Sequence, residues 1–189
     1  MLIYNGLKTD FMADTENDVL EKKLYDAIKN KMNRSTGLSE LNSWRNSLKE
    51  MYITLNDSNI PSDAGVAIEY NIPQTSKRVD FLISGYNKDN KGNVVIVELK
   101  QWEKLQAVEG QDAIVETYTG GANRRVVHPS YQAWSYAALI KDYNEYVQEA
   151  EIECPELLYK IDKFWRTNAD NLGVVYESNY EYLKSRPTD

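Results

Sequence analysis

The sequence predicts an α/β fold in which a central mixed β-sheet is flanked by helices. The first observation is a set of short segments rich in β-branched residues, at 66–72, 79–83 and 94–99. The second is a set of longer segments with apolar residues three and four positions apart, at 14–32, 35–55 and 131–147. Strands and helices that alternate in this way are typical of a layered α/β domain.

The length of the chain limits its domain organisation. With 189 residues it is long enough for one domain with a sizeable core, whereas two full domains would be crowded. We therefore expect one domain over residues 1–150 and a C-terminal extension or linker over residues 151–189. Within the extension, 155–165 has helical periodicity and 172–176 could form an added strand.

The composition argues against several classes of function. The formal net charge is −7, so any contact with nucleic acid must be local or be supplied by another domain. The single cysteine, Cys154, and the single histidine, His128, argue against a disulfide framework and a zinc site. The start lacks the pattern of a signal peptide, and no eighteen apolar residues run together. We expect a cytoplasmic protein that makes no use of a membrane.

Two helices are expected before the first of these strands. The acidic residues at 14–18 suit the start of a helix that continues to residue 32. A second helix is expected within 35–55, where Trp44 occupies an apolar position. Arg45 in this helix could face a phosphate, although base rates favour an exposed or ion-paired arginine.

The strand at 66–72 carries an acid in its middle. If Val66, Ile68, Tyr70 and Ile72 point inward, Glu69 points to the opposite face, where a site on the sheet would lie. The alternative interpretation is an exposed strand glutamate.

The following two strands carry the charges that matter most. A segment dense in turn residues separates them, so they plausibly form a hairpin. Glu98 and Lys100 share one strand face, and Asp80 on the neighbouring strand adds a second carboxylate. Two hard oxygen ligands and an ammonium suit metal-assisted hydrolysis of a phosphodiester, with Mg²⁺ or Mn²⁺ held by Asp80 and Glu98 and the attacking water oriented by Lys100. The alternative is a buried ion pair with Lys100 or with Lys77 and Arg78.

The region between this hairpin and the last long helix is less clearly patterned. Residues 102–119 are expected to be partly helical, although 116–119 could equally be strand. Gly120 and Gly121 predict a flexible loop that ends in Arg124 and Arg125, which could contact a phosphate backbone or simply be part of a loop. No phosphate-binding P-loop motif occurs in the chain.

A helix is expected over 131–147, starting after His128 and Pro129. His128 is as easily a helix cap as a general base. The apolar and aromatic side chains expected to form its packed stripe are Tyr131, Trp134, Ser135, Ala138, Leu139, Tyr143, Tyr146 and Val147.

Four blocks in order resemble a known family. They are Asp63–Pro73, Thr75–Phe81, Val97–Trp102 and His128–Tyr136. The first acid, Asp80, is followed after seventeen residues by Glu98-Leu99-Lys100, which resembles the PD-(D/E)xK nuclease superfamily. Together the blocks look like the nuclease-like N-terminal region of bacterial proteins whose C-terminal part is a Schlafen-group-3-like P-loop ATPase or helicase. The similarity covers roughly residues 1–147.

The resemblance implies a restriction-endonuclease-like core in which Asp80, Glu98 and Lys100 are catalytic. It makes Glu69 a candidate third metal ligand and places Gln132 near the active site, where the alternative is a surface amide. It also implies nucleic acid as a partner, an ATPase or helicase domain in cis or in trans, a homodimer that cuts two strands, and a role in phage defence.

The sequence therefore supports two main hypotheses of different classes. The first is a divalent-metal-dependent nuclease that is a module of a larger ATPase or helicase system. The second is a catalytically inactive nuclease-like module that binds nucleic acid or a protein partner, which the negative net charge favours. A structural dimerisation domain is a third hypothesis, against which the charges within apolar strands argue.

Overall fold

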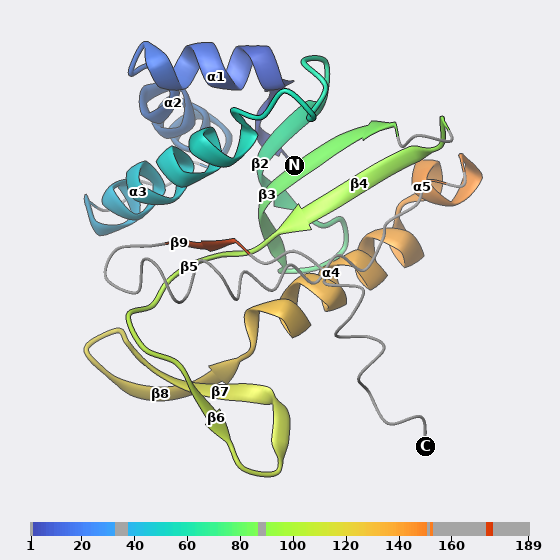
Figure 1. The fold of residues 1–189 in the computed structure, drawn as a ribbon. Helices are drawn as coiled ribbons and strands as arrows, with labels where there is room; N and C mark the ends of the chain where they lie inside the picture. Colours follow the sequence, from blue (N-terminus) through green and yellow to red (C-terminus); the bar gives the residue numbers. More distant parts are fainter. Residues whose placement is uncertain (1, 33–37, 87–89, 151, 153–172, 176–189) are drawn as a thin grey trace.

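The computed structural model describes the chain except for residues 1, 33–37, 87–89, 151, 153–172 and 176–189 (Figure 1). The helices are α1 (Lys8–Glu16), α2 (Leu20–Met32), α3 (Leu38–Leu55), α4 (Pro129–Tyr143) and α5 (Glu145–Glu149). The strands are β1 (Leu2–Leu7), β2 (Gly65–Asn71), β3 (Arg78–Tyr86), β4 (Gly92–Val97), β5 (Leu99–Gln101), β6 (Gln106–Val108), β7 (Gln111–Thr119), β8 (Ala122–Val127) and β9 (Gly173–Val175). The predicted α/β class is confirmed at this level.

The central sheet has four strands in the order β1-β2-β3-β4. Each of its described pairings is antiparallel, so the prediction of a mixed sheet is wrong for these strands. The predicted hairpin is present as β3 and β4, and a short connection of this kind can only join antiparallel neighbours. The strand β1 has no counterpart in the expectations from sequence, and it pairs with β2.

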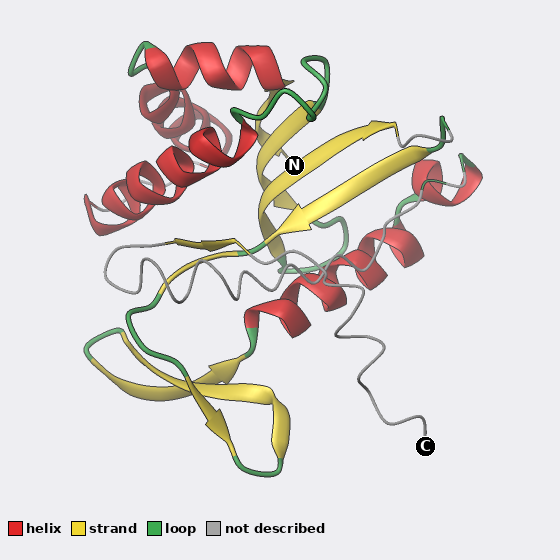
Figure 2. Ribbon diagram, viewed as in Figure 1, coloured by secondary structure: helices red, strands yellow, loops and turns green. Residues whose placement is uncertain are grey.

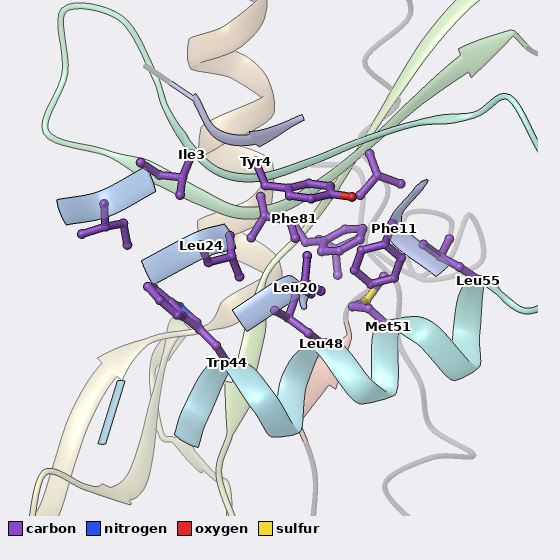
Figure 3. Packing of buried hydrophobic residues seen from close by; sticks show 14 residues of the cluster. Ile3, Tyr4, Phe11, Leu20, Leu24, Trp44, Leu48, Met51, Leu55 and Phe81 are labelled. Carbon is purple, nitrogen blue, oxygen red and sulfur yellow. The ribbon is translucent and has the colours of Figure 1, made fainter. Parts of the chain in front are cut away.

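Helices lie on both sides of this sheet (Figure 2). Helices α1, α2 and α3 lie together on one side, and α4 runs along the other (Figure 1). The first side holds the larger core, where residues of β1, α1, α2, α3 and β3 meet around the edge-to-face pair of Phe11 and Phe81 (Figure 3). The second core lies between the sheet and α4. The sheet is thus covered on both faces, which is what the apolar strands predicted.

The strand β2 changes faces in its middle. Val66 and Ile68 belong to the core under the first three helices, whereas Ile72 belongs to the core under α4, where Tyr70 also packs. The prediction that all four share one face is therefore wrong. The cause is Glu69, whose φ of 57° interrupts the extended backbone and with it the alternation of side chains.

A second sheet of three strands, β6-β7-β8, lies beyond the N-terminal end of α4, away from the central sheet (Figure 1). It corrects two predictions. Residues 102–119 are not partly helical, because 106–108 and 111–119 are strands; the alternative that 116–119 is a strand is confirmed. Arg124 and Arg125 do not lie in a loop, because they belong to β8; the glycines Gly120 and Gly121 form the tight turn that precedes this strand, with φ of 58° and 81°.

The last long helix is present as α4 and α5, but its buried face differs from the predicted stripe. The side chains that pack on the sheet include Ala133, Ala137 and Ile140. Tyr131 and Trp134 are exposed instead. Two small residues one turn apart let the helix approach the sheet closely, and Tyr136 packs beside them. Of the predicted stripe, Leu139 and Val147 pack in this core, whereas the other aromatic members, Tyr143 and Tyr146, are exposed as well.

The C-terminal extension is described only in part. The expected strand near 172–176 is present as β9, which pairs antiparallel with β5. The expected helix at 155–165 lies outside the described residues. No helix in the part of the chain that the structure describes is long and apolar enough to cross a membrane.

Candidate functional site

Three acidic residues occupy one row across neighbouring strands of the central sheet. The register of β2 with β3 places Glu69 opposite Asp80. The register of β3 with β4, continued by one residue, places Asp80 opposite Glu98. These three acids, far apart in the sequence, therefore lie near the point where β4 ends and the short strand β5 begins.

Glu98 is the most deeply buried of the three, with 1% of its surface exposed. Its Oε1 accepts hydrogen bonds from Lys100 Nζ and from Gln132 Nε2, the latter at 2.5 Å. Its Oε2 is also buried and accepts no hydrogen bond from the described residues. Since a buried carboxylate oxygen normally has a donor, this oxygen needs a proton or a cation.

Asp80 is the neighbouring carboxylate. Its Oδ2 accepts a hydrogen bond of 3.0 Å from the backbone N–H of Leu99, which ties the end of β4 to the middle of the hairpin. Burial and the negative charge of Asp80 together raise the pKa of Glu98 to about 8, although Lys100 acts in the opposite direction. When no cation is bound, the raised pKa favours the protonated form of Glu98 beside a second carboxyl group.

The Asp80 and Glu98 pair is chemically suited to Mg²⁺ or Mn²⁺. Mg²⁺ is commonly bound through one or two carboxylates, with water and substrate phosphate completing its six oxygen ligands. The buried Oε2 of Glu98 is an oxygen that such a cation would satisfy, and Asp80 is a neighbouring carboxylate. Among the residues that the structure describes, no group of three or more His, Cys, Asp and Glu is arranged to hold a metal ion.

Glu69 lies in a different environment from the other two acids. It is buried, its Oε1 accepts a hydrogen bond of 3.1 Å from the indole N–H of Trp44, and its Oε2 lies 2.5 Å from Arg78 Nε. The alternative of an exposed strand glutamate is therefore wrong. Its assignment as a third metal ligand stays a prediction.

Gln132 is directly part of the site. One amide hydrogen of Nε2 is directed to Glu98, and a second bond of 2.8 Å joins Nε2 to the hydroxyl of Tyr136. The alternative of a surface amide is wrong. Tyr136 is not among the residues predicted for the site, although its spacing of four residues from Gln132 on one helix places the two side chains together.

The helix that carries Gln132 is held at its start by His128. The Nδ1 atom of His128 accepts a hydrogen bond of 3.1 Å from the backbone N–H of Ser130, and Pro129 follows as the first helical residue. Burial lowers the pKa of His128, which favours the neutral ring that can accept this bond. The interpretation of His128 as a cap is confirmed.

The three arginines proposed for nucleic-acid binding lie elsewhere. Arg45 on α3 is bound through Nε and Nη2 to Glu21 of α2. Arg124 and Arg125 are exposed on β8, and Arg125 Nε lies 3.7 Å from Glu116 on β7. The structure does not bring these side chains into contact with Glu98, and their roles stay predictions.

Comparison of the chain with protein-family models, curated proteins and solved structures found no match. The resemblance to PD-(D/E)xK nucleases therefore stays a prediction, and the function is argued from the geometry of the site.

Proposed function

We propose that the chain is a divalent-metal-dependent nuclease that hydrolyses phosphodiester bonds of nucleic acids. One observation carries the proposal. Glu98 is fully buried, its Oε1 is occupied by Lys100 and Gln132, its Oε2 accepts no hydrogen bond from the described residues, and the charge of Asp80 lies close enough to raise its pKa. A structural ion pair with Lys100 would not need a second carboxylate, whose charge makes the burial of Glu98 more costly.

Each side chain has a definite part in this proposal. Asp80 and Glu98 hold the metal, which when bound polarises the phosphate and makes a coordinated water a better nucleophile. Lys100, fixed on Glu98, orients a water or offsets negative charge that develops on the phosphate. Gln132 fixes the rotamer of Glu98 and thereby the direction of its second oxygen.

The test compares cleavage by the wild type, Asp80→Asn and Lys100→Met in Mg²⁺, Mn²⁺ and EDTA. Fluorescent single- and double-stranded oligonucleotides of DNA and RNA serve as substrates. We expect cleavage only with metal and only in the wild type, with all three proteins folded by circular dichroism. The matched control is Glu109→Gln, an exposed acid outside the site, which should cleave as the wild type does. Equal cleavage by Lys100→Met would contradict the assignment.

A second candidate function is a nuclease-like module that binds nucleic acid or a partner without cleavage. The observation that favours it is the raised pKa of Glu98, because a protonated Glu98 can be stable beside Asp80 without a metal. Calorimetric titration of Mn²⁺ separates the two candidates, since only the nuclease requires a site that Asp80→Asn abolishes.

The wider setting rests on the family resemblance alone. It supports a cytoplasmic module that works with a P-loop ATPase or helicase domain, in cis or in trans, as a homodimer in defence against phage. Analytical ultracentrifugation tests the dimer directly.

A further inference from the structure

The buried pair of Glu69 and Arg78 has no part in the proposed hydrolysis, yet it lies at the same row of the sheet. Glu69 stands opposite Asp80, and Arg78 precedes Asp80 by two residues on β3. Burial and the charge of Glu98 raise the pKa of Tyr136, and the positive charge of Arg78 acts in the opposite direction. Arg78 is therefore close enough to influence the residue that holds Gln132.

The two members of the pair differ in exposure. The Glu69 side chain is 4% exposed, whereas the Arg78 side chain is 31% exposed. The carboxylate is fixed from behind by the indole of Trp44 and contacts the guanidinium through Nε. An arginine oriented in this way loses less conformational entropy when it binds a further anion, and its planar group suits phosphate oxygens.

The backbone conformation of Glu69 also indicates that this arrangement has a function. Glu69 has a φ of 57°, a conformation that costs a glutamate free energy and that recurs at binding and active sites. The same irregularity turns Glu69 out of the strand alternation, toward Trp44 and Arg78. A structural strand position would not need either feature.

The charge balance of the site also favours such a group. Asp80 and Glu98 are both acidic, the whole chain carries a formal charge of −7, and Lys100 is already hydrogen-bonded to Glu98. A phosphodiester that approaches the carboxylates is attracted by a metal ion bound there, and a cation of the protein beside them adds to that attraction.

We propose that Arg78 binds a phosphate of the nucleic acid beside the Asp80 and Glu98 pair, and that Glu69 is the positioning residue that orients it. This proposal rests on the proposed function for the class of ligand, although it needs binding and not cleavage. It gives Glu69 a role other than that of a metal ligand.

The test is the binding of fluorescein-labelled single- and double-stranded DNA and RNA 20-mers, followed by anisotropy in Ca²⁺ without Mg²⁺ at several salt concentrations. We expect Arg78→Gln to weaken binding at least tenfold and to reduce the slope of log K against log salt by about 0.7–0.9, the value for one lost phosphate contact. Arg78→Lys should be intermediate, because the ammonium keeps the charge but loses the planar geometry.

Two further variants keep the test independent of folding. Arg78→Gln alone leaves Glu69 buried without its partner, so the double variant Glu69→Gln/Arg78→Gln removes both charges and should bind as weakly. Glu69→Gln alone should weaken binding several-fold with an unchanged salt slope, because Arg78 remains but is less well oriented. The control Lys23→Gln removes the same charge from an ion pair with Asp14 and should bind within twofold of the wild type.

The outcomes separate this proposal from the proposed function. If the double variant binds every oligonucleotide as tightly as Lys23→Gln does, the role of Arg78 is overturned whether or not the protein cleaves. If the wild type binds but does not cleave in Mg²⁺ or Mn²⁺, the nuclease is refuted and a loss of binding in the Arg78 variants still supports the phosphate site. If the wild type binds none of the 20-mers, both proposals fail.

Discussion

Replacing Glu98 by glutamine should make the metal-free protein more stable, and increasingly so at higher pH. Glutamine keeps the shape of the side chain and can donate a hydrogen to Asp80, but it cannot ionise. The pKa of Glu98 is raised from 4.5 to about 8 in the folded protein. A group with a raised folded pKa stabilises the fold below its unfolded pKa, and this contribution is lost as the pH rises through the folded pKa.

The magnitude follows from that window. Each pH unit between the unfolded and folded pKa values changes the free energy of unfolding by about 1.4 kcal/mol, so the full loss has an upper limit of about 5 kcal/mol. We expect the wild type in EDTA to lose several kcal/mol relative to Glu98→Gln between pH 5 and pH 8.5. Most of the difference should develop above pH 5 and level off above pH 8.

The assay is urea unfolding followed by tryptophan fluorescence at a series of pH values, with EDTA throughout. The exposed Glu109→Gln should follow the wild type at each pH. A stability difference between Glu98→Gln and wild type that is the same at pH 5 and pH 8.5 would refute the reasoning. In a separate series without EDTA, adding Mn²⁺ at pH 8 should stabilise the wild type and leave Glu98→Gln unchanged, because the cation replaces the proton only where Glu98 can ionise.

Three further predictions concern the packing and the helix that carries the site. Met51→Ala removes a fully buried side chain and should lower the free energy of unfolding in urea by about 2–5 kcal/mol. The control Ile53→Ala, on the exposed face of the same helix, should change it by less than about 0.5 kcal/mol. Equal effects would contradict the assigned core. His128→Ala removes a helix cap and should lower the free energy of unfolding by about 1 kcal/mol above pH 6.5. The loss should shrink as the pH falls, because the protonated ring can no longer accept the hydrogen bond. A loss that does not depend on pH would argue against the cap. Tyr136→Phe removes only the hydroxyl that accepts a hydrogen bond from Gln132. The affinity for Mn²⁺, measured by calorimetry, should fall about tenfold while the protein stays folded. An unchanged affinity would show that Gln132 does not need this hydrogen bond.

The pattern of apolar and turn-forming residues predicted a strand or helix correctly where the local sequence favours only one of the two. The strands at 79–83 and 94–99 are present within β3 and in β4 with its continuation, because β-branched residues bounded by turn formers have few alternatives. The helices before them were predicted only in part. Helix α3 lies within 35–55, but the helix expected to start at 14–18 and to continue to residue 32 is wrong at its start, because 14–16 end α1 and α2 begins at Leu20. The predicted hairpin placed Asp80 and Glu98 on neighbouring strands, and the structure sets them opposite one another.

The same pattern gave wrong predictions where a segment is compatible with more than one secondary structure or more than one way of packing. Periodicity predicted a stripe on α4 that includes Tyr131 and Trp134, but Ala133, Tyr136 and Ala137 face the sheet, because the fit of the helix against the sheet decides which side is buried. In 102–119 the mixed polar sequence suited helix or strand, and pairing among β6, β7 and β8 decided the outcome.

The sequence by itself determined the α/β class, the hairpin and the identity of the acids and the lysine at the candidate site. Only the tertiary structure decided which of these groups meet. It brought Gln132 from α4 to Glu98, a contact across thirty-four positions that no local pattern encodes. It also turned Glu69 away from the strand alternation toward Trp44 and Arg78, because a single positive φ, stabilised by contacts from other elements, overrides the period of two that a strand otherwise imposes.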